Sequence, residues 1–541
     1  YYGGNNTDEA NALAVTSDGD IVMAGYTYSD NAIATAGSHQ ATYGGGDDAF
    51  LVRFTTAGVR LWATYYGGSG NDYAYALAVT PGGGDIVMAG YTESPASIAT
   101  AGSHQATNGG GDDAFLARFT SAGLRLWGTY YGGSNGDFAF ALAVAPNGDI
   151  VMAGVTYSDN AITTAGSHQA ALGGKYDAFL VRFTSGGLRL WGTYYGESAA
   201  AYALAIAPDG DIVMAGRTWS SNAIATAGSH QATYGGGDDA FLVRFTADGA
   251  RRWGTYYGGS QLDYAAALAA TSNGDIVMAG ITRSTSSIAT AGSHQATYGG
   301  VYDAFLARFT FGGVRLWGTY YGGSNDDYAK ALAVAANGDI VMAGGTSSTA
   351  SIATAGSHQA TNGGSYDAFL VRFTADGARR WGTFYGGSQL DYATALAATS
   401  NGDIVMAGET RSDNAIATAG SHQAYGGSGG DAFLARFRDD GSTSVEGEEL
   451  LQPVVEIRSI QPNPAAGSVT VVCSGTSAGT IDIVDVQGRI LHSTFIDAGT
   501  TSVPISITDL APGSYQVRFM PHGNSASGMV KASVQALVVV P

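Results

Sequence analysis

Hydrophobic positions occur in short runs that repeat at a nearly fixed distance along most of the chain. The string Asp-Ile-Val-Met-Ala-Gly occurs seven times, and the six tryptophans that precede Gly-Thr or Ala-Thr, from Trp62 to Trp381, lie 62 to 65 residues apart. In the second unit the apolar runs are 76–79, 85–91, 113–119 and 124–131. Turn sequences such as Pro-Asn-Gly-Asp join these runs in pairs and predict two β-hairpins per unit. No segment has a sustained helical period.

The second run of each unit is apolar at consecutive positions, which is typical of a strand covered on both faces. The first run is rich in alanine, which lets neighbouring strands approach closely. A β-propeller has both features, because each blade lies between two others and its inner strands surround the axis. Seven units fall within the common range of blade numbers. The alternative, an open β-solenoid, needs distinct capping units, and neither end of the array shows one.

Partial units at the two ends of the array predict a closed ring. The chain begins Tyr-Tyr-Gly-Gly, which matches the end of a fourth strand, whereas the last unit lacks that strand after Phe437. We therefore expect Tyr1 and Tyr2 to lie in the last blade, beside the strand that begins at Asp431. Such closure removes exposed sheet edges. No charged, apolar leader precedes Tyr1, so we expect any targeting peptide to lie outside this sequence.

The repeated sequences also carry a family resemblance. Gly-Gly-Asp-Asp-Ala-Phe-Leu-Val-Arg-Phe and Gly-Asp-Ile-Val-Met-Ala-Gly-Tyr-Thr, within residues 1–437, resemble the SBBP β-propeller repeat of bacterial secreted proteins. The resemblance implies an extracellular propeller and no particular activity. This chain has the histidine of Ser-His-Gln where the family usually carries an aromatic residue.

The composition changes after Phe437. Residues 438–453 are polar and acidic and predict a linker. Residues 454–541 contain no repeat, and strands are expected at 469–473, 480–486, 515–519 and 534–540. These short strands predict a small β-sandwich. The whole chain is thus expected to be all-β, with a seven-bladed β-propeller followed by a small β-sandwich domain.

Four motifs follow one another in the last segment: Pro-Asn-Pro at 462–464, Val-Asp-Val-Gln-Gly-Arg at 484–489, Leu-Ala-Pro-Gly-Ser-Tyr at 510–515 and Met-Val-Lys at 529–531. In this order they are similar to the type A sorting domain of type IX secretion. The resemblance implies that residues 454–541 engage the type IX machinery of a Bacteroidetes-type bacterium. A secreted or outer-surface location follows from it. The final Ala-Leu-Val-Val-Val-Pro extends past the usual end of that domain.

The net charge and the cysteine content exclude several classes of partner and site. The net charge of −20 argues against nucleic acid and anionic membrane surfaces, which require a basic face. No apolar run reaches ~18 residues, so no membrane span is expected. The single cysteine, Cys473, allows neither an internal disulfide nor a thiolate metal cluster.

The repeated polar residues have structural interpretations. One histidine per unit, from His39 to His422, is too far from its copies to share a metal ion at ~2 Å, so each is expected to brace the long loop between strands two and three. Methionines such as Met88 belong to the core. The tyrosine pairs that end the fourth strands are expected to pack between blades, with stacking on sugars as the alternative.

Paired aspartates are the candidate cation ligands. Asp47-Asp48, Asp112-Asp113 and Asp238-Asp239 lie in Gly-rich loops, whose carbonyl groups suit calcium. No EF-hand loop occurs, however. A strand-end cap, or an ion pair with a repeated arginine such as Arg53, accounts for the same residues. Calcium stays open as an alternative, and no other cofactor is expected.

The candidate binding site consists of positions that differ between units. The residue after Met-Ala-Gly varies in size and charge at the start of a loop of roughly 20 residues, where binding residues concentrate. Exposed tryptophan and arginine are typical binding anchors. The expected ligand-binding residues are Arg217, Trp219, Tyr26, Tyr91 and Glu409.

An enzyme needs an asymmetric set of nucleophile, base and orienting group, and nearly every polar residue here is repeated. No nucleophile-elbow, zinc-protease or phosphate-loop motif occurs. We therefore expect a secreted or cell-surface binding, adhesion or scaffold protein, whose partner is an extracellular glycan or protein or a second copy of the chain. Two alternatives stay open. One is a structural protein that polymerises into fibres. The other is a carbohydrate-active hydrolase or lyase on the loop face.

Overall fold

The computed structural model describes residues 1–438 except 83 and 428, and residues 456–461, 467–474, 479–485, 489–497, 500, 502–521 and 533–539. The regular structure in these ranges is entirely β, and none of it is helical. Accordingly, the described residues contain no helix that could cross a membrane. The chain divides into two compact units, Tyr1–Thr443 and Ser444–Pro541. The expected acidic linker, 438–453, lies outside the described residues except for Arg438, as do the motifs at 462–464 and 529–531.

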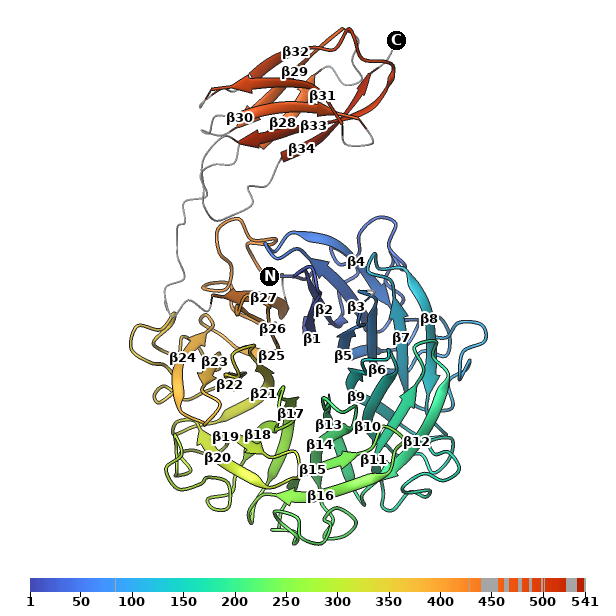
Figure 1. Cartoon of the computed structure of the whole chain (residues 1–541), viewed down its shortest axis with the longest axis vertical. Coiled ribbons are helices and arrows are strands. Elements are labelled where there is room, and N and C mark those ends of the chain that lie inside the picture. Colours follow the sequence, from blue (N-terminus) through green and yellow to red (C-terminus); the bar gives the residue numbers. More distant parts are fainter. Residues whose placement is uncertain are drawn as a thin grey trace. The chain divides into compact units, whose positions relative to one another are not determined.

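The first unit repeats one four-stranded antiparallel sheet (Figure 1). In the second sheet, the strands β5 (Asp72–Val79), β6 (Ile86–Thr92), β7 (Asp113–Phe119) and β8 (Arg125–Tyr131) lie in chain order. The predictions for strands two to four are confirmed to within one residue. The first strand begins four residues earlier than predicted, because its pairing with β6 continues through a β-bulge between Ala74 and Ala76.

Equivalent strands form the other sheets of this unit. They are β1 (Asp8–Val15), β2 (Ile21–Thr27), β3 (Asp48–Phe54) and β4 (Arg60–Tyr66); β9 (Asp137–Val144), β10 (Ile150–Thr156), β11 (Asp177–Phe183) and β12 (Arg189–Tyr195); β13 (Ala199–Ile206), β14 (Ile212–Thr218), β15 (Asp239–Phe245) and β16 (Arg251–Tyr257); β17 (Asp263–Ala270), β18 (Ile276–Thr282), β19 (Asp303–Phe309) and β20 (Arg315–Tyr321); β21 (Asp327–Val334), β22 (Ile340–Thr346), β23 (Asp367–Phe373) and β24 (Arg379–Tyr385); and β25 (Asp391–Ala398), β26 (Ile404–Thr410) and β27 (Asp431–Phe437).

The sheets are arranged around one axis, with the first strand of each sheet nearest to the axis and the fourth strand of each four-stranded sheet outermost (Figure 1). Each sheet shares its core with its neighbour. Val22 of the first sheet, for example, packs in one cluster with Met88 and Phe115 of the second. All three side chains are fully buried. Apolar residues at consecutive positions of the second strand are therefore explained by cover on both faces.

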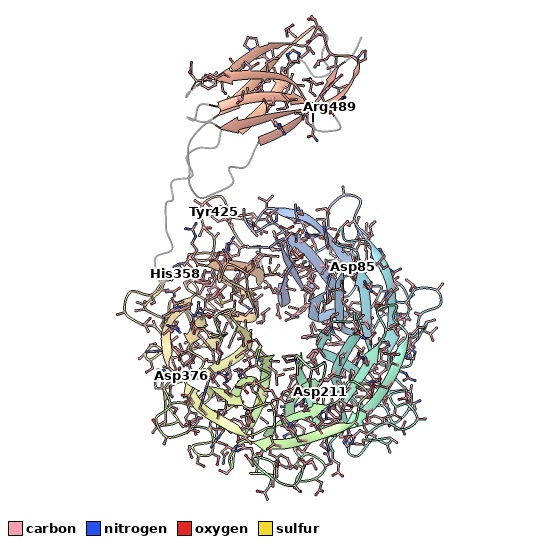
Figure 2. The ribbon with its side chains drawn as sticks, viewed as in Figure 1. Asp85, Asp211, His358, Asp376, Tyr425 and Arg489 are labelled. Carbon is pink, nitrogen blue, oxygen red and sulfur yellow. The ribbon has the colours of Figure 1, made fainter. Side chains whose placement is uncertain are left out.

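One histidine per repeat links neighbouring sheets. The His104 ring packs against Tyr131 and against Phe183 of the third sheet, at centroid distances of 6.2 and 5.7 Å. Burial lowers the pKa of His104 to about 4, so its imidazole is neutral near pH 7. The prediction that these histidines brace the long loop is confirmed, with the addition that they reach the next sheet. His358, labelled in Figure 2, makes the same contacts with Tyr385 and Phe437.

Replacing such a histidine by phenylalanine is expected to reduce sensitivity to acid. The folded-state pKa of about 4 lies below the usual 6.5. The unfolded chain therefore binds a proton that the folded chain does not between these pH values, and stability falls as the pH falls through this window. In His104→Phe, the loss of unfolding free energy between pH 8 and pH 5 should shrink by about 1 kcal/mol, after allowance for partial solvent screening. Denaturant titrations at both pH values measure this. An unchanged pH dependence would contradict it.

The N-terminal residues lie against the last sheet of this unit. The Tyr2 amide donates to the carbonyl oxygen of Ala432 at 2.8 Å and forms a β-bridge beside β27. The Tyr2 hydroxyl donates to the carbonyl oxygen of Ile33 in the first sheet, just as Tyr66 donates to Ile98 one sheet later. The tyrosine pairs are buried in this way, so their packing role is confirmed.

The second unit contains two sheets around one hydrophobic core. Their strands are β28 (Glu456–Gln461), β29 (Ser468–Ser474) and β32 (Ser502–Ser506), and β31 (Ile490–Ile496), β30 (Gly479–Val484), β33 (Gly513–Pro521) and β34 (Ser533–Val539). Val469 from one sheet and Ile481 and Val517 from the other lie in the same cluster. The strands predicted at 469–473, 480–486, 515–519 and 534–540 overlap β29, β30, β33 and β34. The strands β28, β31 and β32 were not predicted. Most residues of β31 are exposed or half-buried, so its sequence lacks an apolar pattern.

Candidate ligand-binding rim

The second strand of each sheet ends in a sequence in which constant and variable positions alternate. In the first sheet this is Tyr26-Thr27-Tyr28-Ser29, with Thr27 and Ser29 buried. Both hydroxyls donate to the carboxylate of Asp8, Ser29 at 2.9 Å. The variable side chains alternate with these anchored ones, so they project from a fixed backbone.

We call the variable positions on either side of this threonine the rim. It consists of Tyr26 and Tyr28, Tyr91 and Glu93, Val155 and Tyr157, Arg217 and Trp219, Ile281 and Arg283, Gly345 and Ser347, and Glu409 and Arg411. The first member of each pair faces the first strand of its own sheet, as Tyr91 faces Tyr73 and Glu409 faces Tyr392. The rim therefore follows the first strands, which lie nearest to the axis of the sheets.

Aromatic side chains form an unbroken arc along this rim. Neighbouring ring centroids lie 4.7 to 6.3 Å apart along Tyr28, Tyr26, Tyr73, Tyr91, Phe138, Tyr157, Tyr176 and Trp219. The Arg217 guanidinium lies 4.9 Å from the Trp219 ring and 5.8 Å from Tyr202, which in turn contacts Tyr264 at 6.1 Å. The arc thus extends from the first sheet to the fifth.

The structure brings the predicted residues Arg217 and Trp219 together. The Trp219 side chain is 48% exposed and stands above the guanidinium. An Arg217 Nη atom lies 3.6 Å from Asp238, whose pKa is raised by burial and lowered in part by Arg217. The Nε atom of Arg217 is buried and has no hydrogen-bond partner among the described residues. A buried donor without a partner is energetically costly.

The other predicted residues form a second cluster on the arc. Tyr26 and Tyr91 both contact the Tyr73 ring, at 4.7 and 4.9 Å. Glu409 is paired with Arg411 at 3.1 Å. Glu409 also lies close enough to Glu9 for its charge to affect the pKa of the Glu9 carboxyl group. Burial raises the pKa of Glu9, the hydrogen bond with Tyr26 lowers it, and the charge of Glu409 raises it further.

Two aspartates at the rim also have unused acceptor atoms. Oδ1 of Asp47 and Oδ1 of Asp326 are buried and accept no hydrogen bond from any described residue. The other oxygen of each carboxylate accepts from a tyrosine hydroxyl, Tyr73 for Asp47 and Tyr366 for Asp326. Like Arg217 Nε, these oxygens are buried polar atoms without a hydrogen-bond partner among the described residues.

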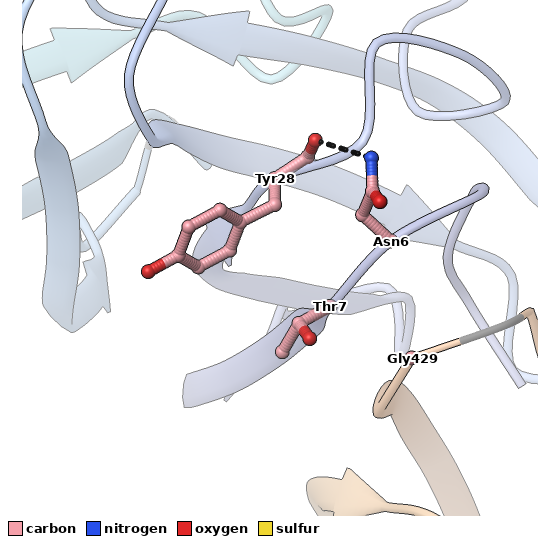
Figure 3. Close-up of a pocket in the computed structure, with 4 residues that line it drawn as sticks. All are labelled: Asn6, Thr7, Tyr28 and Gly429. Atoms are coloured by element: carbon pink, nitrogen blue, oxygen red, sulfur yellow. Dashed lines mark hydrogen bonds between the residues drawn. The ribbon is translucent and has the colours of Figure 1, made fainter.

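A shallow pocket lies at one end of the arc (Figure 3). It has a volume of about 290 Å³ and is lined by Asn6, Thr7, Tyr28 and Gly429. The Asn6 side-chain amide donates to the Tyr28 carbonyl oxygen at 3.0 Å and holds its wall in place. The pocket adds polar groups next to the exposed ring of Tyr28.

The second aspartate of a pair is hydrogen-bonded within its own loop. The Asp48 carboxylate accepts from the Gly44 amide at 2.7 Å and from Gln40 Nε2 at 3.0 Å, so the interpretation as a cap is confirmed. Arg53 pairs instead with Asp20, at 3.0 Å. Figure 2 labels Asp85 and Asp211, which correspond to Asp20 in other repeats. Within the described ranges, no group of three or more His, Cys, Asp or Glu side chains is placed to hold a metal ion.

Sequence reasoning missed most of the arc. Tyr28 and Tyr157 were detectable, because they occupy the same position as Trp219 in their repeats. Tyr73 and Tyr202 lie on first strands and reach the rim only through strand pairing and neighbouring sheets. Asp238 was considered only as a loop residue, and its proximity to Arg217 required the fold.

Residues 459–531 match the protein family described as the secretion system C-terminal sorting domain. The second unit is a type IX sorting domain. It directs export by type IX secretion to the cell surface or the extracellular space, which confirms the location expected from the sequence.

Other similarities are partial. The regulatory protein FlaEY of Caulobacter vibrioides is 31% identical over 144 residues, which cover 26% of this chain and 15% of that protein. Virginiamycin B lyase of Staphylococcus aureus is 10% identical, with coverage of 73% and 90% and a TM-score of 0.37. A polysaccharide lyase, an ulvan lyase bound to a saccharide, is 9% identical, with coverage of 75% and 92% and a TM-score of 0.41. A Bacteroides caccae protein of unknown function is 13% identical, with coverage of 54% and 78% and a TM-score of 0.30.

Proposed function

We propose that the chain is a type IX-secreted binding protein in which a closed seven-bladed β-propeller, residues 1–437, binds an extracellular glycan through its rim. Residues 438–453 are the linker and residues 454–541 the β-sandwich sorting domain. Ring closure is supported by contacts between the ends of the array. The His422 ring packs 5.6 Å from Phe54, and Arg436 donates to the Thr56 carbonyl oxygen at 2.9 Å, as the corresponding residues do between successive sheets.

The aromatic arc is the observation that carries the glycan assignment. Tyrosine and tryptophan combine an apolar face with a polar atom, and this suits sugar rings, which present both C–H faces and hydroxyl groups. The Arg217 side chain, which is 32% exposed beside the Trp219 ring, supplies N–H donors for such hydroxyls. Because the arc spans five sheets, it fits an extended saccharide better than a compact small molecule.

Binding of the purified full chain to immobilised extracellular polysaccharides tests this function. We expect saturable binding that soluble oligosaccharide of the same composition displaces. A bovine serum albumin surface serves as the control for nonspecific attachment. Absence of binding to every polysaccharide tested, together with binding to a protein ligand that the rim variants abolish, would contradict the glycan assignment.

A hydrolase is the second candidate, favoured by the two carboxylates of Glu9 and Glu409. A glycoside hydrolase uses one carboxyl group with a raised pKa as acid and a second that stays ionised. Burial raises the pKa of Glu9, and Arg411 holds Glu409 by an ion pair. On this hypothesis Glu409→Gln would lower reducing-end release by about 10³-fold, with binding retained. If the wild-type chain releases no reducing ends from a glycan that it binds, this candidate is wrong.

A further inference from the structure

Three basic side chains lie on consecutive sheets at one end of the aromatic arc. Arg217 belongs to the fourth sheet, Arg283 follows β18 in the fifth, and Lys330 lies on β21, the first strand of the sixth. The structure describes the first strands of all the sheets in this unit, and Lys330 is the one basic residue on them. In a chain with a net charge of −20, these residues concentrate positive charge at one place.

Two tyrosine rings connect the three cations. The Nζ atom of Lys330 lies 5.9 Å from the centre of the Tyr264 ring, and the Arg283 guanidinium lies 5.0 Å from that of Tyr302. Burial raises the pKa of Tyr264 to about 12, the positive charge of Arg217 lowers it, and Tyr302 raises it. Arg217 and Tyr302 are therefore both close to Tyr264. The three basic groups thus border one pair of aromatic faces.

Two of these cations lack an acidic partner. Every other arginine in the described part of residues 1–437 binds a carboxylate or a carbonyl oxygen, whereas the exposed Arg283 guanidinium binds neither. Lys330 is also exposed and forms no ion pair with a described residue. Burial among the surrounding sheets lowers the pKa of Lys330, and no neighbouring carboxylate opposes this. An anion beside Lys330 would restore the stability of its charged form.

The first and second sheets carry the opposite charge at the rim. Burial raises the pKa of Asp47 and of Asp112, and the negative charge of Glu93 raises each further. No lysine or arginine of the described ranges pairs with any of these three carboxylates. Unpaired acids and unpaired bases therefore occupy different parts of the rim. Such a separation attracts an anionic ligand to one part and repels it from the other.

We propose that the glycan bound at the rim is acidic, and that Arg217, Arg283 and Lys330 form the subsite for its carboxylate or sulfate groups. This inference rests on the proposed function and adds the chemical class of the ligand. The guanidinium groups donate paired N–H bonds to either kind of anion, and the lysine adds a point charge. The faces of Tyr264 and Tyr302 accept the sugar rings between these charges.

Binding of matched acidic and neutral saccharides to the full chain is the first test. One pair is oligogalacturonate and its carboxyl-reduced form, and the other is dextran sulfate and dextran, so the two pairs distinguish a carboxylate from a sulfate requirement. We expect at least one acidic member to bind about 10-fold more tightly than its neutral counterpart, with a difference that decreases as salt is added. Equal affinities within both pairs would overturn the proposal.

A double variant localises this preference. Arg283→Gln with Lys330→Gln should remove most of the preference for the acidic saccharide and leave the affinity for its neutral counterpart unchanged. The matched control is Arg252→Gln with Arg380→Gln, which makes the same change in net charge. These two arginines are 49% and 50% exposed on the outer strands β16 and β24. An equal loss in the control would show that net charge, and no local subsite, causes the preference.

A direct observation of Lys330 separates this inference from the proposed function. The chain has three lysines, Lys175, Lys330 and Lys531, so ¹³C-dimethylation gives few lysine signals, and Lys330→Gln identifies the relevant one. We expect inorganic sulfate to shift the Lys330 signal more than sodium chloride of equal ionic strength does. If sulfate shifts it but no saccharide binds, the anion subsite stands and glycan recognition is wrong. If an acidic saccharide binds and leaves the Lys330 signal unchanged, glycan recognition stands and this subsite is wrong.

Discussion

Removal of residues 454–541 is expected to leave nearly all of the protein inside the cell envelope, while the first unit still folds. Export depends on the sorting domain, which matches over residues 459–531. Folding of the repeats does not depend on it, because the cores of the two units consist of different residues, such as Met88 in one and Ile481 in the other. Immunoblots of medium and cell fractions, with thermal unfolding of the purified truncation, measure both effects. Normal secretion of the truncated chain would refute the export role.

Replacing Arg217 and Trp219 together by alanine is expected to weaken glycan binding by about 100-fold. The guanidinium lies 4.9 Å from the indole ring, and the tryptophan is half exposed toward one end of the arc. Arginine and tryptophan anchors of this kind each contribute about 2 kcal/mol or more when truncated, and their contributions are not strictly additive. Titration with the oligosaccharide that binds the wild-type chain measures the loss.

A matched control for this variant lies on the outer strand of the third sheet. Leu190 is 47% exposed, close to the exposure of Trp219, but it belongs to β12, away from the rim. Leu190→Ala should bind as the wild-type chain does. If the Arg217 and Trp219 variant folds normally and binds with unchanged affinity, the ligand site lies elsewhere on the molecule.

The fold was largely predictable because the same order of apolar runs and turns recurs in each repeat. Short turns set the hairpins, and apolar residues at consecutive positions marked the buried second strand, so β6 and β7 were predicted to within one residue. The first strand was predicted too short, since a bulge at Ala74 to Ala76 breaks the simple alternation. The pattern of apolar and polar residues does not predict such a bulge.

The candidate site was predictable only in part. Arg217 and Trp219 stood out because they differ from the corresponding residues of other repeats. The arc did not, because its contacts join different sheets, as Tyr26 meets Tyr73 and Tyr176 meets Trp219. Of the two interpretations of the repeated aspartates, the cap is confirmed, whereas Arg53 forms its ion pairs with Asp18 and Asp20. Pairing with Asp20 follows from strand register, which places the two residues at the same end of adjacent strands.

Hydrogen exchange of the full chain, with and without the bound oligosaccharide, tests the central claim most directly. The account predicts slower amide exchange at the rim, in segments 26–30 and 217–221, and unchanged exchange at the turns on the opposite side of the sheets, in 56–58 and 121–123. Protection confined to those turns, or to residues 456–539 of the sorting domain, would contradict recognition at the rim.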